Sequence, residues 1–197
     1  MAKNLFPQKM DLVIKDGSSL LDLKDTDLQI LEEKSEILQK WADDIVKTFY
    51  DKLYSYPNTA KIVEKFPREA LEKTLKEWYL SLLKGKPSED FWKRQWFVGL
   101  AHIARGVDNV YMLSMMSHIQ LEFGKKCFET FEKDEAWRIF EAFKKLTDVI
   151  TSLIVEGYLD LYKKAIEGMS GIKPALIDRM AYLESQKMWE EYKNQRG

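Results

Sequence analysis

The segment from Asp134 to about Ile166 carries the longest regular apolar pattern in the chain. Its apolar residues recur at spacings of three and four, which is the period of an amphipathic helix. They are Trp137, Phe140, Phe143, Leu146, Ile150, Leu153, Ile154 and Leu161. At a rise of 1.5 Å per residue, such a helix is about 45 to 50 Å long. A small domain cannot cover that length on all sides, so we expect a partner subunit.

The rest of the chain shows the same periodicity, and no segment alternates as a strand does or carries an Asn-Gly hairpin signal. The motif Thr26-x-x-Gln29 is a capping box that predicts the start of a first helix. A second helix, ended by Tyr56-Pro57, is predicted by Ile37, Trp41, Ile45, Phe49 and Leu53. Further helices are expected at about 59–65, 67–85, 88–106, 108–131, 134–166 and 175–192. The sequence therefore predicts an all-α fold.

Breaks in the pattern predict how the chain is organised. Residues 1–24 mix Pro7, Gly17 and two serines with short apolar pairs, which predicts an irregular N-terminal extension packed over the rest. The segment Gly168–Pro174, GMSGIKP, is the clearest break, because glycine and proline interrupt helices. We expect one domain over residues 1–168, with 1–24 as its extension, and a linker with an extra helix over residues 169–197.

Charge and hydropathy exclude several kinds of partner. The chain has 31 basic and 32 acidic residues, and they are interspersed rather than gathered into a basic stripe, so we expect no nucleic-acid partner. No apolar run approaches the roughly 20 residues that span a bilayer, and the N-terminus lacks the apolar core of a signal peptide. We therefore expect a cytoplasmic protein that does not contact a membrane.

The usual signatures of enzymes and metal sites are missing. Neither Glu-x-x-His nor His-Glu-x-x-His occurs, no glycine-rich phosphate loop is present, and the single Cys127 has no partner for a disulfide. We expect no enzymatic activity. The motif C-x-x-C-H is also absent, so a haem group, if the protein binds one, is not covalently attached.

The stretch from Phe91 to Phe123 contains both histidines, His102 and His118. Gly99 and Gly106 lie within one turn of His102, and glycines in a helix often mark the close approach of another surface. That surface is either a flat ligand or a neighbouring helix, and a lone histidine on an apolar face is more often an ordinary core residue. We interpret His118 as structural.

Two motifs resemble those of the sensor globins, the group formed by the globin domains of globin-coupled sensors and by protoglobins. The segment 98–106, VGLAHIARG, followed by Val110-Tyr111, resembles the group's V-G-x-x-H-x-x-x-G element. The segment 49–53, FYDKL, is similar to the group's F-Y-D-x-L stretch. The resemblance covers roughly Thr26 to Ile166. The chain departs from the pattern at Val110, where a tryptophan is common, and at Asp108-Asn109, which replace a turn that contains proline.

The resemblance implies a globin-like fold that binds haem b non-covalently. It implies that His102 is the proximal iron ligand and that Tyr50 faces the bound gas; a core tyrosine bonded to the backbone is the alternative reading of Tyr50. Leu71 and Thr74 correspond to distal-pocket positions, and Arg94 and Arg105 are candidates to bind the haem propionates. The complete predicted haem site is His102, Tyr50, Phe49, Leu71, Thr74, Leu75, Trp78, Val98 and Tyr111.

The function implied by the resemblance is reversible binding of a diatomic gas by a sensor. The candidate gases are oxygen, carbon monoxide and nitric oxide, with oxygen first among them. We expect a homodimer formed through the helices at about 109–131 and 134–166, and a separate signalling partner. The alternative is a globin-fold protein-interaction module that does not bind haem. A haem enzyme is less favoured, because nitric oxide dioxygenation needs an electron donor and no reductase domain is encoded here.

Overall fold

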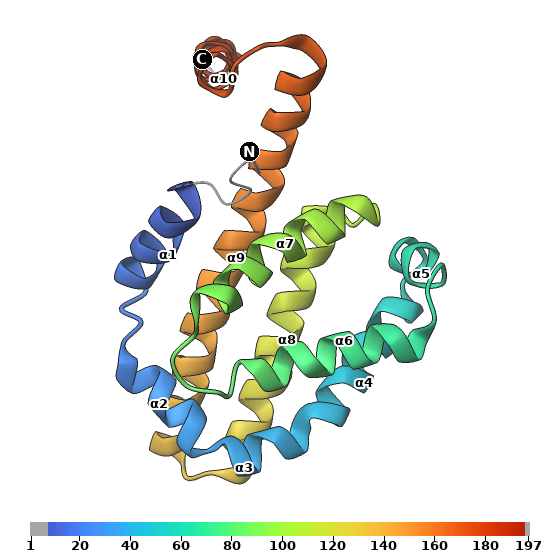
Figure 1. Cartoon of the computed structure of the whole chain (residues 1–197), viewed down its shortest axis with the longest axis vertical. Helices are drawn as coiled ribbons and strands as arrows, with labels where there is room; N and C mark the ends of the chain where they lie inside the picture. The colour runs from blue at the N-terminus through green and yellow to red at the C-terminus, as the bar shows by residue number, and fades with distance from the viewer. Residues whose placement is uncertain (1–7, 196–197) are drawn as a thin grey trace. The chain divides into compact units, whose positions relative to one another are not determined.

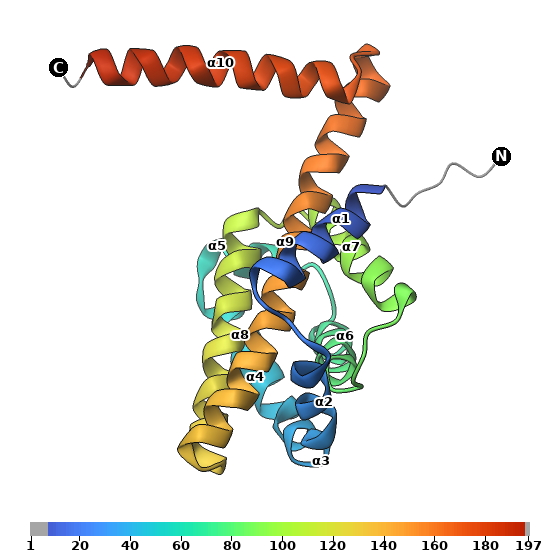
Figure 2. The ribbon, with the colours of Figure 1, turned by 90° about the vertical axis from the view of Figure 1, so that its left-hand side faces the viewer.

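The computed structural model describes residues 8–195, and within that range it contains helices and no strand. The predicted all-α class is confirmed. Figures 1 and 2 show the helices in two views. They are α1 (Gln8–Leu20), α2 (Asp25–Glu33), α3 (Ser35–Leu38), the 3-10 turn η1 (Gln39–Trp41), α4 (Ala42–Ser55), α5 (Pro57–Val63), α6 (Arg68–Ser81), α7 (Glu89–Ala104), α8 (Asn109–Thr130), α9 (Lys133–Ser170) and α10 (Pro174–Asn194).

The chain forms two compact units, residues 1–156 and residues 157–197. The first unit contains α1 to α8 and the beginning of α9, and the second contains the end of α9 and α10. Helix α9 continues through the predicted break as far as Ser170, and Gly171 follows with a φ of 74°. The division at residue 168 stays a prediction. None of the helices in residues 8–195 has the length and apolar composition that a membrane span requires.

The centre of the first unit lies where α8 and α9 pack side by side (Figures 1 and 2). The rings of Phe123 in α8 and Phe143 in α9 are stacked, with centroids 3.8 Å apart and planes 9° apart. Tyr79 of α6 contacts both rings, and its hydroxyl donates a 2.8 Å hydrogen bond to the carbonyl of Leu38. This aromatic cluster fixes α6 against the α8–α9 pair.

The N-terminal extension is a helix where it is described, so the prediction of an irregular extension is wrong for residues 8–20. Residues 1–7 lie outside the described range. Met10, Val13 and Ile14 are three and four positions apart, so α1 presents an apolar face. That face packs against Trp92 and Trp96 of α7. The part of the prediction that places this segment over the rest of the domain is confirmed.

Two local predictions also need correction. Helix α2 is capped by Lys24 and Asp27 rather than by Thr26 and Gln29, because the Asp27 carboxylate accepts a 2.9 Å hydrogen bond from the Lys24 N–H. The predicted second helix is divided into α3, η1 and α4. The 3-10 turn ends at Trp41, whose ring meets Phe123 and Phe131 edge-on at 5.5 and 6.1 Å. The predicted end of α4 before Pro57 is confirmed.

Candidate functional site

A cavity of about 760 Å³ lies among helices α4 to α8 of the first unit, and Ile154 of α9 also lines it. Ligand pockets in proteins have volumes of roughly 300–1,000 Å³. All the residues of the predicted site line this cavity: Phe49, Tyr50, Leu71, Thr74, Leu75, Trp78, Val98, His102 and Tyr111. Folding therefore brings together side chains that come from four separate helices.

His102 reaches the cavity from the last turn of α7. The helix begins as predicted, with the Ser88 hydroxyl accepting a 3.2 Å hydrogen bond from the N–H of Phe91. It ends in a Schellman motif, in which the N–H of Val107 donates to the carbonyl of His102 at 2.9 Å. Gly106 has a φ of 72°, as this motif requires. A Cβ atom at Gly106 would meet no atom of the described residues within 4 Å, so no neighbouring helix approaches this glycine closely, and the close approach of a ligand there stays a prediction.

The imidazole of His102 is half-buried and neutral at pH 7. Burial, and to a lesser extent the positive charge of Arg105, lower its pKa to about 4. Its Nδ1 atom is fully buried and has no hydrogen-bond partner within the described part of the chain. A neutral imidazole carries one N–H and one free lone pair. Such a ring, with one ring nitrogen free to bind, has the form of an axial metal ligand.

Tyr50 reaches the same cavity from α4, with 7% of its surface exposed. Its hydroxyl donates a 3.0 Å hydrogen bond to the backbone carbonyl of Leu71 in α6. Burial raises the pKa of the phenol well above its usual value, so the hydroxyl keeps its proton. A phenol has a single proton to donate. The alternative reading of Tyr50, a core tyrosine bonded to the backbone, therefore describes its contact in this structure, and its role toward a gas stays a prediction.

The other polar side chains of the predicted site bond within the protein. Thr74 donates to the carbonyl of Ala70 at 2.9 Å. The Nε1 atom of Trp78 donates to Gln95 Oε1 at 2.9 Å, and Gln95 Nε2 donates to the carbonyl of Phe91 at 3.2 Å. The Trp78–Gln95 bond joins α6 to α7 across the cavity wall. Gln95, which lies two helical turns before His102, is a lining residue that was not predicted from the sequence.

Several further lining residues were also missed or left open. Met112, Met115, Met116 and Ile119 of α8 also line the cavity, and Phe66 lines it from the loop before α6. Methionines are common where an irregular apolar space must be filled, so their spacing carried no signal of a pocket. Both Arg94 and Arg105 line the cavity. His118 is not among the lining residues.

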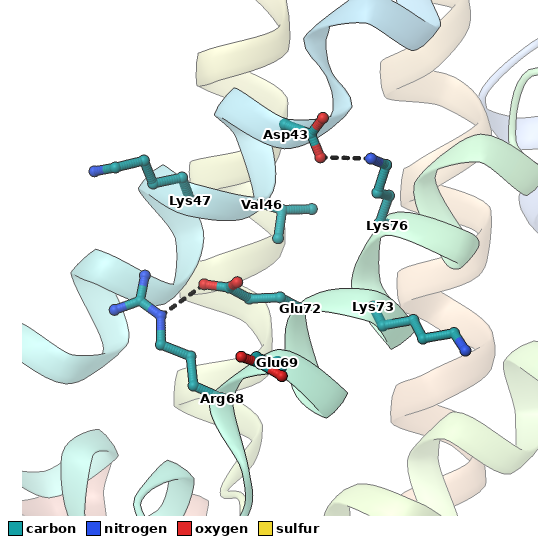
Figure 3. Close-up of a pocket in the computed structure, with 8 residues that line it drawn as sticks. All are labelled: Asp43, Val46, Lys47, Arg68, Glu69, Glu72, Lys73 and Lys76. Atoms are coloured by element: carbon teal, nitrogen blue, oxygen red, sulfur yellow. Dashed lines mark hydrogen bonds and ion pairs between the residues drawn. The ribbon is translucent and has the colours of Figure 1, made fainter.

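A second, charged pocket of about 540 Å³ lies between α4 and α6 (Figure 3). Two ion pairs lie within it: Lys76 binds Asp43 at 2.6 Å, and Arg68 binds Glu72 at 2.6 Å. These side chains are substantially exposed, and exposed ion pairs contribute little stability individually. We interpret this pocket as a solvated set of ion pairs that joins the outer parts of α4 and α6.

The known proteins to which this chain is similar are globins. A family model described as Protoglobin matches residues 13–164. Among solved structures, the globin domain of a Geobacter sulfurreducens globin-coupled sensor matches at 20% identity and a TM-score of 0.68, covering 73% of this chain and 96% of that one. The globin domain of E. coli DosC in a ferric form matches at 14% identity and a TM-score of 0.60, covering 74% and 99%. No curated protein matches. The structural matches confirm the predicted globin-like fold.

Proposed function

The chain belongs to the protoglobin family, and from this premise we propose that it is a gas-sensing globin that binds haem b non-covalently. One observation carries the proposal. A single cavity is lined by a neutral imidazole from α7 and by a protonated phenol from α4. The imidazole could ligate iron, and the phenol could donate a hydrogen bond to a bound gas.

The residues of the cavity fit a haem group in size and chemistry. The volume of about 760 Å³ lies within the usual range of ligand pockets. The walls are mainly aliphatic and aromatic, and Thr74, Trp78 and Gln95 already bond within the protein. The apolar macrocycle of haem would therefore contact mainly apolar side chains. The neutral imidazole of His102 lines the cavity and would offer the lone pair of a ring nitrogen to iron.

The two walls of the cavity would have different tasks. Haem iron supplies the chemistry that binds a diatomic gas reversibly. His102 would hold the iron from α7, with its neutral form secured by burial. The Tyr50 hydroxyl would donate a hydrogen bond to the gas. To do so, it must break its hydrogen bond to the Leu71 carbonyl. A hydrogen bond to a partly charged acceptor is strong, so a phenol donor favours oxygen over the less polarised carbon monoxide.

We further propose that the protein acts as a homodimer through α8 and α9 and signals to a separate partner. A stripe of large apolar side chains is exposed along α8, with exposed fractions between 44% and 66%: Val110, Leu113, Leu121 and Phe128. These positions share one face of the helix. Trp137 at the start of α9 is 54% exposed. Large apolar side chains exposed along one helix face are typical of an interface.

Reconstitution with haem tests the proposed function. The purified chain should give a Soret absorption band when haem is added to the haem-free protein. The variant His102→Ala should lose the band or shift it strongly, because the axial nitrogen is removed. His118→Ala is the matched control, since this histidine does not line the cavity, and it should bind haem as the unmodified chain does.

Two results would contradict this assignment in different ways. A chain that gives no Soret band would leave the haem-free interaction module as the function. A normal band and normal ligation in His102→Ala would keep haem binding and would move the iron ligand to another residue.

A further inference from the structure

A hydrogen-bonded bridge joins α6 to α7 in the wall of the cavity. The indole Nε1 of Trp78 donates a 2.9 Å hydrogen bond to Gln95 Oε1, and Gln95 Nε2 donates a 3.2 Å hydrogen bond to the carbonyl of Phe91. Both Trp78 and Gln95 line the cavity. Gln95 is only 2% exposed, although glutamine side chains mostly lie at protein surfaces. The proposed ligation of iron and gas does not use this buried amide.

The chemistry of the two partners explains why an amide stands at position 95. An indole N–H can only donate a hydrogen bond, and a backbone carbonyl can only accept one. A side chain that joins them must therefore offer both an acceptor and a donor, as an amide does. Leucine, which is similar in size, would make neither bond. A buried polar network whose members are bonded makes its surroundings rigid. The Gln95 amide bonds on both sides, so it holds α6 and α7 at a defined separation.

The residues that follow each end of the bridge are anchored in the core. Tyr79 follows Trp78 in α6 and is fully buried in the aromatic cluster of the first unit. Trp96 follows Gln95 in α7, is 1% exposed and packs with Met10 of α1. Successive residues of a helix point about 100° apart. Contacts in two such directions fix the rotation of α7 about its own axis.

The bridge therefore bears on the orientation of His102. This histidine lies seven positions after Gln95 in the same helix, which is nearly two turns. The two side chains thus face almost the same direction, and both line the cavity. A rotation of α7 at Gln95 would turn the imidazole of His102 with it.

The same spacing recurs in α6. Leu71 lies seven positions before Trp78, and its carbonyl accepts the hydrogen bond of Tyr50. Tyr50 and His102 are thus connected through α6, the bridge and α7. Under the proposed function, the Tyr50 hydroxyl has two alternative acceptors, the Leu71 carbonyl and a bound gas. It supplies the element with two discrete arrangements that coupling between two sites requires.

We propose that Gln95 is a positioning residue that couples the two walls of the cavity, so that the bonding state of the Tyr50 hydroxyl changes the orientation of His102. The inference rests on the proposed function, because it concerns the same cavity. While Tyr50 is bonded to Leu71, α6 is tied to α4. When the hydroxyl turns to another acceptor, that tie is lost. The bridge then carries the displacement of α6 to α7.

The first test uses the haem-free chain and needs no cofactor. Gln95→Leu removes the bridge, and Gln120→Leu is the matched control. Gln120 is also a buried amide, but it joins α8 to α9 through Thr147 and Asp148 and does not line the cavity. NMR gives the hydrogen-exchange rate of the Trp78 indole N–H, whose signal is the one that Trp78→Phe removes. Gln95→Leu should speed this exchange about tenfold, because a local hydrogen bond is lost, and Gln120→Leu should not.

The second test uses the haem-loaded chain with ferrous iron and no gas. Resonance Raman spectroscopy gives the iron–histidine stretching band, which depends on the orientation of the His102 ring. Gln95→Leu and Trp78→Phe should each shift this band, and Gln120→Leu should leave it unchanged. Tyr50→Phe, which also frees α6 from α4, should shift the band in the unmodified chain. In the Gln95→Leu background, Tyr50→Phe should have no further effect.

The two tests separate a coupling role from a merely structural one. An unchanged band in Gln95→Leu, or an equal shift in Gln120→Leu, would overturn the inference while haem binding stands. An effect of Tyr50→Phe that is the same with and without the bridge would also overturn it. If Gln95→Leu does not fold, Trp78→Phe carries the same comparisons, because it keeps an aromatic ring and removes the donor. A chain that gives no Soret band would overturn the proposed function, and this inference with it.

Discussion

At the scale of single residues, Tyr50 has one proton and two acceptors that compete for it. In this structure the proton is donated to the Leu71 carbonyl at 3.0 Å. A gas bound in the cavity would be the second acceptor. An ordinary hydrogen bond contributes about 0.5–1.5 kcal/mol, and one to a charged acceptor about 1.5–3 kcal/mol. The hydrogen bond from Tyr50 to the gas replaces the one to Leu71. Its net contribution to gas binding is therefore the difference between the two hydrogen-bond energies, about 1 kcal/mol.

Replacing Tyr50 with phenylalanine should measure that difference. Tyr50→Phe should speed oxygen dissociation from the haem-loaded protein roughly fivefold, as expected for a loss of about 1 kcal/mol. Stopped-flow or flash photolysis gives the rate. The dissociation rate of carbon monoxide is the internal control and should change little. An unchanged rate for oxygen would mean that Tyr50 remains bonded to Leu71 and takes no part in gas binding.

At the scale of elements, the contact between α8 and α9 depends on a glycine. A Cβ atom at Gly124 of α8 would lie 2.9 Å from two ring carbons of Phe140 in α9. The ring of Phe140 also contacts Trp137, with centroids 6.0 Å apart, so moving the Phe140 ring away from α8 would disturb this second contact. Close by, buried Gln120 donates hydrogen bonds to Thr147 at 2.9 Å and to Asp148 at 2.7 Å. The glycine and the polar bonds together fix how the two helices meet.

The variant Gly124→Ala tests this close approach. Alanine favours a helix by up to about 1 kcal/mol over glycine, whereas overpacking costs about 1–3 kcal/mol. We expect Gly124→Ala to lower the free energy of unfolding by about 1 kcal/mol, as measured by denaturant titration. In a Phe140→Ala background, the same change should raise the free energy of unfolding, because only the helical preference of alanine remains. A loss of equal size in both backgrounds would show that Phe140 is not the obstacle.

At the scale of the whole molecule, the first unit buries its aromatic core but leaves apolar side chains exposed along α8. Leu121 is 66% exposed and Phe128 is 49% exposed. Helix α9 extends over 38 residues, which is about 57 Å at the usual rise. These features support the proposed dimer, because a second copy would cover the apolar stripe.

The oligomeric state of two variants checks the dimer. Leu121→Glu should increase the dissociation constant of the dimer at least tenfold, because an unpaired charge would enter an apolar interface. Leu12→Glu in α1 is the matched control, since Leu12 is 56% exposed and lies on neither proposed interface helix. Analytical ultracentrifugation over a range of concentrations gives the constants. A chain that remains monomeric throughout, or that dimerises equally well with Leu121→Glu, would contradict the proposed interface.

Most helices and the candidate site residues could be predicted from the amino-acid sequence. Helical periodicity and the signals from Ser88 and Gly106 are local properties, so α7 could be predicted with both of its ends. The motifs around Tyr50 and His102 identified a site whose predicted members all line one cavity. The prediction was wrong for α1, where Gly17 and two serines weaken the helical signal. The apolar face of α1 packs against Trp92 and Trp96, far away in the sequence.

The contacts of individual side chains could not be predicted, because they form between helices that are far apart in the sequence. The sequence left Arg94 and Arg105 equivalent, and in the structure the guanidinium of Arg105 lies over the ring of Phe66. It also left open whether Tyr50 bonds to the backbone, and the approach of Leu71 supplies that acceptor. The physical reason is that hydrogen bonds, ring contacts and burial depend on distances between segments that are remote in the chain. Periodicity and motifs report only what one segment prefers, so these distances appear when the helices pack.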